Sequence, residues 1–117
     1  TLSPPQPSDE RARRVADGLL ADPTDGPSLA AWGREVGASA RTLARLFTAE
    51  TGLGFERWRT AARMAAALPL LADGTSVAAT AMRVGYATPS AFVAAFRREV
   101  GTTPAGYFRP PGAADSA

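Results

Sequence analysis

One pattern occurs twice in the chain, as SLAAWGREVGASARTLARLFTAETG (residues 28–52) and as SVAATAMRVGYATPSAFVAAFRREVG (residues 76–101). The copies align at an offset of 48 residues up to Gly37 and Gly85, and at 49 after the turn because the second turn is one residue longer. Each copy reads as a helix of about nine residues, a tight turn at the glycine, and a longer helix. That arrangement is the plan of a helix-turn-helix unit.

Both copies meet the physical requirements of such a unit. Small residues, Gly33 and Ala81, lie midway along the first helix, where the two helices are expected to cross closely. The turn needs a residue that tolerates the left-handed conformation, and glycine supplies it. Apolar side chains would hold the second helix to the body: Leu43, Leu46 and Phe47, then Phe92 and Phe96. A plain helical bundle would explain one copy, but two copies at a near-constant offset favour a double helix-turn-helix.

The remaining segments also read as helices, so the predicted fold is all-α, with about seven helices. Ser8 is expected to cap a first helix whose apolar residues recur at i, i+3, i+4 and i+7. A long helix over about residues 55–72 links the two helix-turn-helix subdomains, and Pro69 is expected to kink it. Thr103-Pro104 starts a short last helix. No segment shows the sustained alternation typical of a β-strand.

These elements divide the chain into a domain and two flanking segments. Residues 1–7 are rich in proline and are expected to be a disordered linker or remnant, and residues 110–117 a disordered tail. Residues 8–109 are expected to form the double helix-turn-helix domain. It has three parts: a first unit (8–53), a linker helix (55–73) and a second unit (76–109).

Composition excludes several kinds of chemistry. The 117 residues include no cysteine and no histidine, which excludes disulfides, thiolate metal sites and histidine-based acid–base catalysis. No nucleophile–base constellation can be read among the remaining polar residues, so we expect no enzyme, no cofactor and no metal site. No apolar run approaches the ~18 residues of a membrane span, and no secretion leader is visible.

The positive charge is concentrated in one part of the chain. Residues 28–109 contain 10 arginines and 5 acidic residues, whereas residues 1–27 contain 3 arginines and 5 acidic residues. All 13 basic residues are arginine, the side chain best suited to bidentate binding of phosphate and guanine. A GC-rich genome would also favour arginine codons, so charge alone is weak evidence for a nucleic-acid partner.

The second helix of the first copy has a basic side. Its apolar stripe leaves Arg41, Arg45 and Thr48 on the opposite side of the helix, with Ala44 beside them. Arg41 and Arg45 lie one turn apart near the helix start, as the base-reading residues of a recognition helix do. Each can bind guanine O6 and N7 or a phosphate. A solvated basic surface is the alternative interpretation.

The corresponding helix of the second copy has a different outward side. Its outward positions hold Ser90, Ala94 and Arg97, with Val93 and Arg98 at the edges. The repeat places Ser90 where Arg41 stands, and Ala94 where Arg45 stands. Small side chains can contact thymine methyl groups, and the arginines can contact phosphates. We therefore expect the first unit to carry most direct readout, and the second to add affinity, positioning and shape recognition.

The linker helix has a length that suits two adjacent grooves of DNA. About 18 residues at ~1.5 Å per residue span roughly 27 Å. Successive major grooves on one face of the duplex lie about 34 Å apart. Arg57, Arg59 and Arg63 on this helix are equally compatible with phosphate contacts and with an ordinary surface.

At this level the sequence resembles the DNA-binding domain of AraC/XylS-type bacterial transcription regulators over residues 28–109. The stretch from Val84-Gly85-Tyr86 to Tyr107 is similar to that family's signature region. The other residues that carry this similarity are Ser90, Ala91, Phe92, Phe96, Gly101, Thr103 and Pro104. The resemblance implies a seven-helix domain that binds two successive major-groove segments as a monomer, in a protein that activates or represses transcription.

The resemblance also implies roles for particular residues. The base-reading positions would be Arg41, Ala44, Arg45, Pro89, Ser90, Val93 and Ala94. The candidates for backbone contacts, including those argued above, are Ser39, Thr42, Thr48, Arg57, Arg59, Arg63, Thr88, Arg97 and Arg98. A long polar residue is frequent in the family at the position of Ala94, so its absence here weakens second-site specificity.

The expected partner is double-stranded DNA, with RNA polymerase as a further partner. The chain is expected to be the C-terminal part of a longer ligand-responsive regulator whose effector or dimerisation domain lies elsewhere, in the cytoplasm and associated with the nucleoid. Some DNA-repair methyltransferases carry a similar domain beside methyl-accepting cysteines, an activity that a chain without cysteine cannot have. The alternative function is a protein-interaction module that contacts RNA polymerase or another regulator.

Overall fold

The computed structural model describes residues 4–24 and 26–108, and its regular elements over these ranges are all helices. The elements are α1 (Glu10–Ala21), α2 (Leu29–Val36), α3 (Ala40–Thr51), α4 (Phe55–Ala72), α5 (Val77–Arg83), α6 (Pro89–Val100) and α7 (Pro104–Tyr107). The prediction of an all-α fold with about seven helices is therefore confirmed over the described part of the chain.

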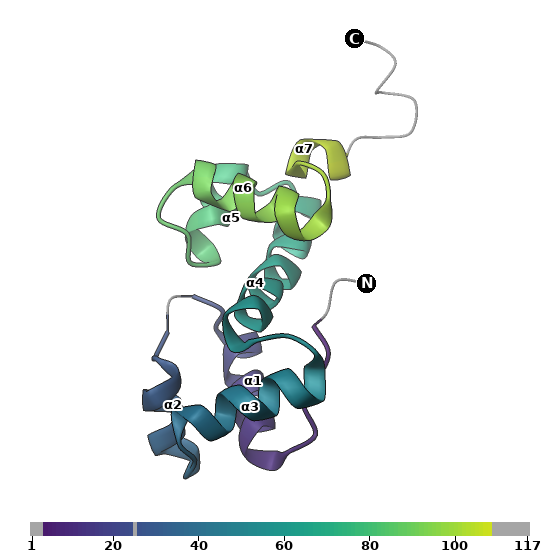
Figure 1. The fold of residues 1–117 in the computed structure, drawn as a ribbon. Coiled ribbons are helices and arrows are strands. Elements are labelled where there is room, and N and C mark those ends of the chain that lie inside the picture. Colours follow the sequence, from purple (N-terminus) through teal and green to yellow (C-terminus); the bar gives the residue numbers. More distant parts are fainter. Residues whose placement is uncertain (1–3, 25, 109–117) are drawn as a thin grey trace, which may run out of the picture.

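Two bundles lie at opposite ends of α4 (Figure 1). The helices α1–α3 form the first unit and α5–α7 the second, and the main packed helix pairs lie within one unit or include α4. The hydrophobic core is divided in the same way. On α4, Phe55, Trp58 and Ala62 belong to the first core, whereas Met64 and Ala67 belong to the second. Each unit therefore has its own core, and α4 contributes to both.

The two copies of the repeat start and end their helices with the same chemistry. The turn glycines Gly37 and Gly85 have φ values of 78° and 99°, a region that costs other residues roughly 1–2 kcal/mol. A hydroxyl side chain caps the start of five helices, each cap contributing about 1 kcal/mol. The capping residues are Ser28, Ser39, Ser76, Thr88 and Thr103. The repeat seen in the sequence is thus present in the backbone.

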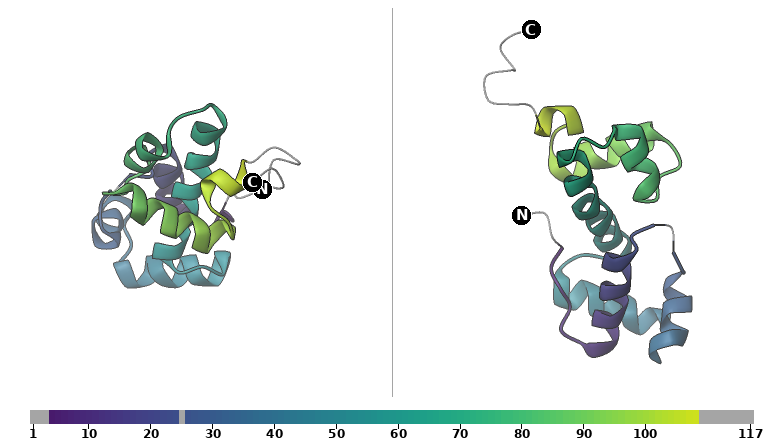
Figure 2. Two further views of the ribbon diagram at one scale, coloured as in Figure 1. Left: turned by 90° about the horizontal axis from the view of Figure 1, so that it is seen from above. Right: turned by 180° about the vertical axis from the view of Figure 1, so that it is seen from behind.

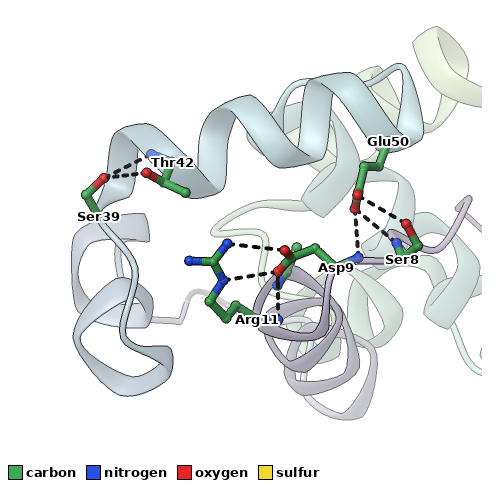
Figure 3. A network of polar contacts seen from close by, with 7 residues as sticks. Ser8, Asp9, Arg11, Ser39, Thr42 and Glu50 are labelled. Atoms are coloured by element: carbon green, nitrogen blue, oxygen red, sulfur yellow. Dashed lines mark hydrogen bonds and ion pairs between the residues drawn. The ribbon is translucent and has the colours of Figure 1, made fainter.

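The start of α1 differs from the expectation. Asp9, and not Ser8, is the N-cap, and its carboxylate accepts hydrogen bonds from the N–H groups of Arg11 and Ala12. Ser8 instead donates to the Glu50 carboxylate from its N–H (3.0 Å) and its hydroxyl (3.1 Å), and the Asp9 N–H adds a bond of 2.9 Å (Figure 3). The Arg11 guanidinium bonds to Asp9 and holds the pKa of that carboxyl below its ordinary value. The capping prediction was wrong because it considered only α1, and not the end of α3.

The expectation of disorder fails for residues 4–7. Pro4 and Pro7 are buried, and the Pro5 carbonyl accepts a hydrogen bond of 2.6 Å from Nε1 of the buried Trp58. Proline is apolar and fixes its own φ, so this segment loses little conformational freedom when it covers Trp58. Residues 1–3 and the expected tail 110–117 lie outside the described residues.

The helix α4 continues across Pro69 to Ala72. Pro69 is exposed, and the N–H of Asp73 still reaches its carbonyl at 3.0 Å. Leu68, Leu70 and Leu71 pack against the second core, which favours retention of this last turn.

Gly33 is required for a different reason from the one expected. A Cβ at this position would overlap the carbonyl oxygen of Ala38 in the turn, whereas the backbone nitrogen of Ala40, the first residue of α3, would lie in ordinary contact at 3.5 Å. Ala81 occupies the equivalent place in the second unit, where the turn is one residue longer, and it is fully buried. On α1, Gly18 makes room in a similar way for the ring of Trp32. The small residues of the first unit thus serve its tighter turn and its packing.

Candidate nucleic-acid interface

The outward side of α3 carries two arginines that have no partner among the residues described by the structure. Leu43 and Phe47 are fully buried on the inner side, whereas Arg41 and Arg45 are exposed. No hydrogen bond or ion pair joins either guanidinium to another residue within 4–24 and 26–108. Thr48 is exposed farther along, and the two arginines face away from the core, as the periodicity predicted.

The outward side of α6 is small and largely apolar. Pro89, Ser90 and Ala94 are exposed, Val93 is half-buried, and Ala44, the equivalent of Val93 on α3, is half-buried too. The helix is held from behind by two fully buried rings, Phe92 and Phe96. The exposed surface therefore offers methyl and methylene groups with one hydroxyl, as predicted for the second copy.

The last turn of α6 restores positive charge. Arg97 and Arg98 are both exposed. Nε of Arg98 lies 3.5 Å from a carboxylate oxygen of Glu99, whereas Arg97 has no partner among the residues that the structure describes. Arg97 occupies the position of Thr48 in the repeat, so the second unit has its cation one turn later than the first.

The two helices share one side of the molecule. In Figure 1, α3 and α6 lie toward the viewer at the two ends of α4, and each runs from left to right. The view from above and the view from behind in Figure 2 agree, and place α1 on the opposite side from α3. One extended partner can therefore contact both outward surfaces.

The arginines at the start of α4 differ in their availability. Arg57 is 70% exposed and lies 3.8 Å from Glu99, a loose pair. Arg59 is only 14% exposed: its guanidinium bonds to both oxygens of Glu56 (2.8 and 3.1 Å) and lies over the Phe55 ring at 5.3 Å. Arg57 is thus placed for a phosphate contact, whereas Arg59 is engaged within its own helix.

Arg63 is also engaged inside the molecule. Its Nε donates a hydrogen bond of 2.9 Å to the Pro23 carbonyl, and its guanidinium lies over the Tyr86 ring at 5.3 Å. Because the guanidinium is already bound in this way, the expected contact with a phosphate is disfavoured. The two contacts link Arg63 to Pro23 and Tyr86, which lie far apart in the sequence.

Two of the expected backbone contacts, Ser39 and Thr88, are also helix caps, and a third, Thr42, bonds to the first of these caps. Ser39 Oγ accepts the Thr42 N–H at 3.0 Å and donates to Thr42 Oγ1 at 3.0 Å, at the start of α3 (Figure 3). Thr88 Oγ1 accepts the Ala91 N–H at 3.1 Å at the start of α6. Ser39 and Thr88 are exposed, so a phosphate could approach these helix starts.

The described surface offers little to a small substrate. An open hollow of about 420 Å³ between α4 and α6 is lined by Glu56, Arg57, Thr60, Arg98 and Glu99. Arg57 and Arg98 pair with Glu99 in it, and all of its lining residues are polar or charged, without the apolar and aromatic side chains typical of small-molecule sites. Within residues 4–24 and 26–108 no three or more carboxylates gather as metal ligands, and no helix there is long and apolar enough to span a membrane.

One pair of structural residues was missed in the sequence, although the repeat carried a signal. Glu50 and Glu99 are equivalent at the offset of 49, and each lies at the end of its recognition-type helix. Glu50 binds the start of α1, and Glu99 lies near Arg57 at the start of α4. The partners of the two glutamates, Ser8 and Arg57, are also 49 residues apart. The start of α4 therefore packs in the second unit as the start of α1 does in the first.

Known proteins are similar to this chain in sequence and in fold. Residues 32–110 match the helix-turn-helix domain family. The chain is 42% identical over 105 residues to the HTH-type transcriptional regulator RipA of Corynebacterium glutamicum, which covers 90% of this chain and 32% of RipA. A solved structure of the C-terminal domain of AraT, a response regulator from Geobacillus stearothermophilus, superposes on this chain with a TM-score of 0.77 at 27% identity. The match covers 86% of this chain and 85% of the AraT chain. The DNA-binding domain of AdpA, solved in complex with a target DNA, gives 0.72 at 32% identity, covering 86% and 90%.

Two helix-turn-helix units on one shared helix, each with an outward second helix, define a double helix-turn-helix domain. The chain belongs to the AraC-type helix-turn-helix family, which confirms the resemblance seen in the sequence. It spans about a third of the length of the curated relatives that it matches.

Proposed function

We propose that this chain is the sequence-specific DNA-binding domain of a transcription regulator, with α3 in one major groove and α6 in the next. The observation that carries the proposal is the outward pair Arg41 and Arg45, exposed and without a partner among the described residues, on the same side of the molecule as α6. The 18 residues of α4 span roughly 27 Å, close to the distance between adjacent grooves.

The proposal assigns different work to the two helices. On α3, Arg41 and Arg45 donate to guanine O6 and N7, and Ala44 allows the helix close to the bases. On α6, Val93 and Ala94 contact thymine methyl groups, while Pro89 and Ser90 bring the helix start to the groove floor. Phosphate contacts come from three exposed arginines (Arg57, Arg97 and Arg98), from the helix caps Ser39 and Thr88, and from the hydroxyl groups of Thr42 and Thr48 on α3.

The relatives support this assignment. The AdpA domain is described as bound to target DNA, and RipA is described as a transcriptional regulator. Because the curated relatives are about three times longer, we propose that the domain acts within a longer cytoplasmic regulator that carries an effector or dimerisation domain. The role is recognition of DNA and not catalysis.

Salt dependence of binding to duplex DNA tests the proposal against the alternative of a protein-interaction module. Neutralising four phosphates would lower affinity by about a hundredfold between about 50 and 200 mM salt. The double substitution Arg41→Ala with Arg45→Ala is expected to lower affinity for a selected site most strongly. Little retention of DNA at any salt concentration would contradict the proposal and favour a protein partner.

A further inference from the structure

Arg63 lies at the boundary between the two halves of the molecule. Its neighbour Ala62 belongs to the first hydrophobic core, and Met64 belongs to the second. The main packed helix pairs lie within one unit or include α4, so the relative placement of the units depends on this helix and on contacts that cross the boundary.

The side chain of Arg63 contacts both units at once. On one side its Nε donates to the carbonyl of Pro23, which follows α1 in the first unit, at 2.9 Å. On the other side its guanidinium carbon lies 5.3 Å from the centroid of the Tyr86 ring, in the turn between α5 and α6. Tyr86 in turn packs on Phe92 of the second core, with ring centroids 5.8 Å apart. Figure 1 shows the segment after α1 approaching the second bundle beside α4.

The chemistry of arginine suits this double contact. A planar guanidinium can donate a hydrogen bond along its edge while its face lies over an aromatic ring. A lysine ammonium is a compact point charge and cannot present an edge and a face together. A single helix fixes the distance between two bundles along its axis, and a contact away from that axis adds a restraint on rotation and bending.

We propose that Arg63 is a positioning residue that fixes the orientation of the second helix-turn-helix unit relative to the first. It thereby sets the spacing between the two DNA segments that α3 and α6 contact. The DNA part of this inference rests on the proposed function, whereas the orientation of the units can be measured without DNA. Arg63 acts through the Pro23 carbonyl and the Tyr86 ring, and not as a phosphate ligand.

A distance measurement in the absence of DNA tests the orientation directly. The chain has no cysteine, so Glu35→Cys on α2 and Ala78→Cys on α5, both exposed positions, would carry unique spin labels. Arg63→Ala is expected to broaden or shift the distance distribution between them. Arg59→Ala is the matched control, because Arg59 also binds a ring and an oxygen partner but only within α4. A distribution unchanged by Arg63→Ala would overturn the inference.

Binding to duplexes of altered spacing tests the consequence for DNA. The probes are a selected two-part site and the same site with one base pair inserted or removed between its parts. Arg63→Ala is expected to weaken binding at the preferred spacing by about fivefold, the effect of one lost cation–π contact, and to reduce the discrimination against altered spacing. An unchanged spacing profile would overturn the inference. A wild-type protein without any spacing preference would overturn the two-groove function itself, and the DNA part of the inference with it.

Tyr86 provides a second route to the same test if Arg63→Ala does not fold. Tyr86→Leu removes the ring under the guanidinium and is expected to reproduce both effects. Tyr86→Phe keeps the ring and is expected to retain the wild-type distance distribution and spacing profile. Equal behaviour of Tyr86→Leu and Tyr86→Phe in both measurements would contradict the proposed contact.

Discussion

The two helix-turn-helix units bury equivalent positions but present different side chains on their outer sides. At the offset of 49, Phe47 and Phe96 are equivalent and both are fully buried. At the same offset, Arg45 of α3 is replaced by Ala94 of α6, and both are exposed. Folding constrains the inner positions and the caps, because each unit needs a core and satisfied helix ends. The outer positions are left to recognition, so one scaffold presents two different surfaces.

Glu50 and Glu99, which are equivalent in the repeat, also differ between the two units, in the partners that they bind. Glu50 accepts three hydrogen bonds from Ser8 and Asp9, whereas Glu99 has two longer contacts, with Arg57 at 3.8 Å and Arg98 at 3.5 Å. Each glutamate joins the end of a recognition-type helix to the first helix of its unit. The donors differ because the chain begins α1 from an extended segment but begins α4 directly after a glycine.

The largest expected effect tests whether the two cores are independent. Phe47→Ala and Phe96→Ala each remove a fully buried ring and are expected to destabilise the domain by about 3–5 kcal/mol. Because each ring belongs to one core, hydrogen-exchange protection should fall mainly in the unit that carries the substitution. Equal loss of protection in both units from either variant would show that the cores act as one.

The next effect concerns the outward difference between α3 and α6. Arg45→Ala is expected to lower affinity for the selected site by about 1–3 kcal/mol and to relax specificity at particular bases, and Arg41→Ala should do likewise. The equivalent change on α6, Ala94→Ser, is expected to cost under about 1 kcal/mol. Affinities for the selected and for random duplexes measure both. Equal loss on the two kinds of DNA after Arg45→Ala would refute its assignment as a reader.

The glutamates should differ in their contributions to stability. Glu50→Ala removes the acceptor of three hydrogen bonds and is expected to lower the free energy of unfolding by about 1–2 kcal/mol. Glu99→Ala loses only contacts to largely exposed arginines and should cost under about 1 kcal/mol. Urea unfolding of both variants decides the comparison, and a larger cost for Glu99→Ala would reverse it.

The smallest expected effect concerns the last turns of the two helices. Arg97→Ala should weaken binding to all sequences alike and make the salt slope less steep by about 0.9, the change for one phosphate contact. Thr48→Ala, at the equivalent position of α3, removes no charge and should leave the slope unchanged. Slopes measured on random duplex DNA provide the test, and a specific loss on the selected site alone would assign Arg97 to base reading.

Local signals in the sequence were sufficient for most of the fold. Hydroxyl caps, turn glycines and apolar periodicity depend on residues a few positions apart, and the repeat doubled each signal. The same periodicity placed Arg41 and Arg45 on the outer side of α3. Their role in reading bases stays a prediction, because an outward position shows availability and not a partner.

Contacts between distant residues could not be predicted in this way. The bond from Ser8 to Glu50, the cover that Pro5 gives to Trp58, and the link from Arg63 to Pro23 join residues 40 or more positions apart. None of these three contacts produces a periodic pattern in the sequence, because each depends on how the helices pack. Arg63 therefore looked like a surface arginine, and only its surroundings show that it is engaged. Arg59 is a different case, because its partners Phe55 and Glu56 lie four and three positions away in the same helix.

Selection of binding sites from random duplexes tests the central claim most directly. An asymmetric two-part footprint is expected, with a strongly specified segment that contains guanine under α3 and a weakly specified segment one helical turn away under α6. Arg45→Ala should erase the preference in the first segment only. Recovery of no enriched sequence, or of a single segment whose preference is unaffected by Arg45→Ala, would contradict the claim.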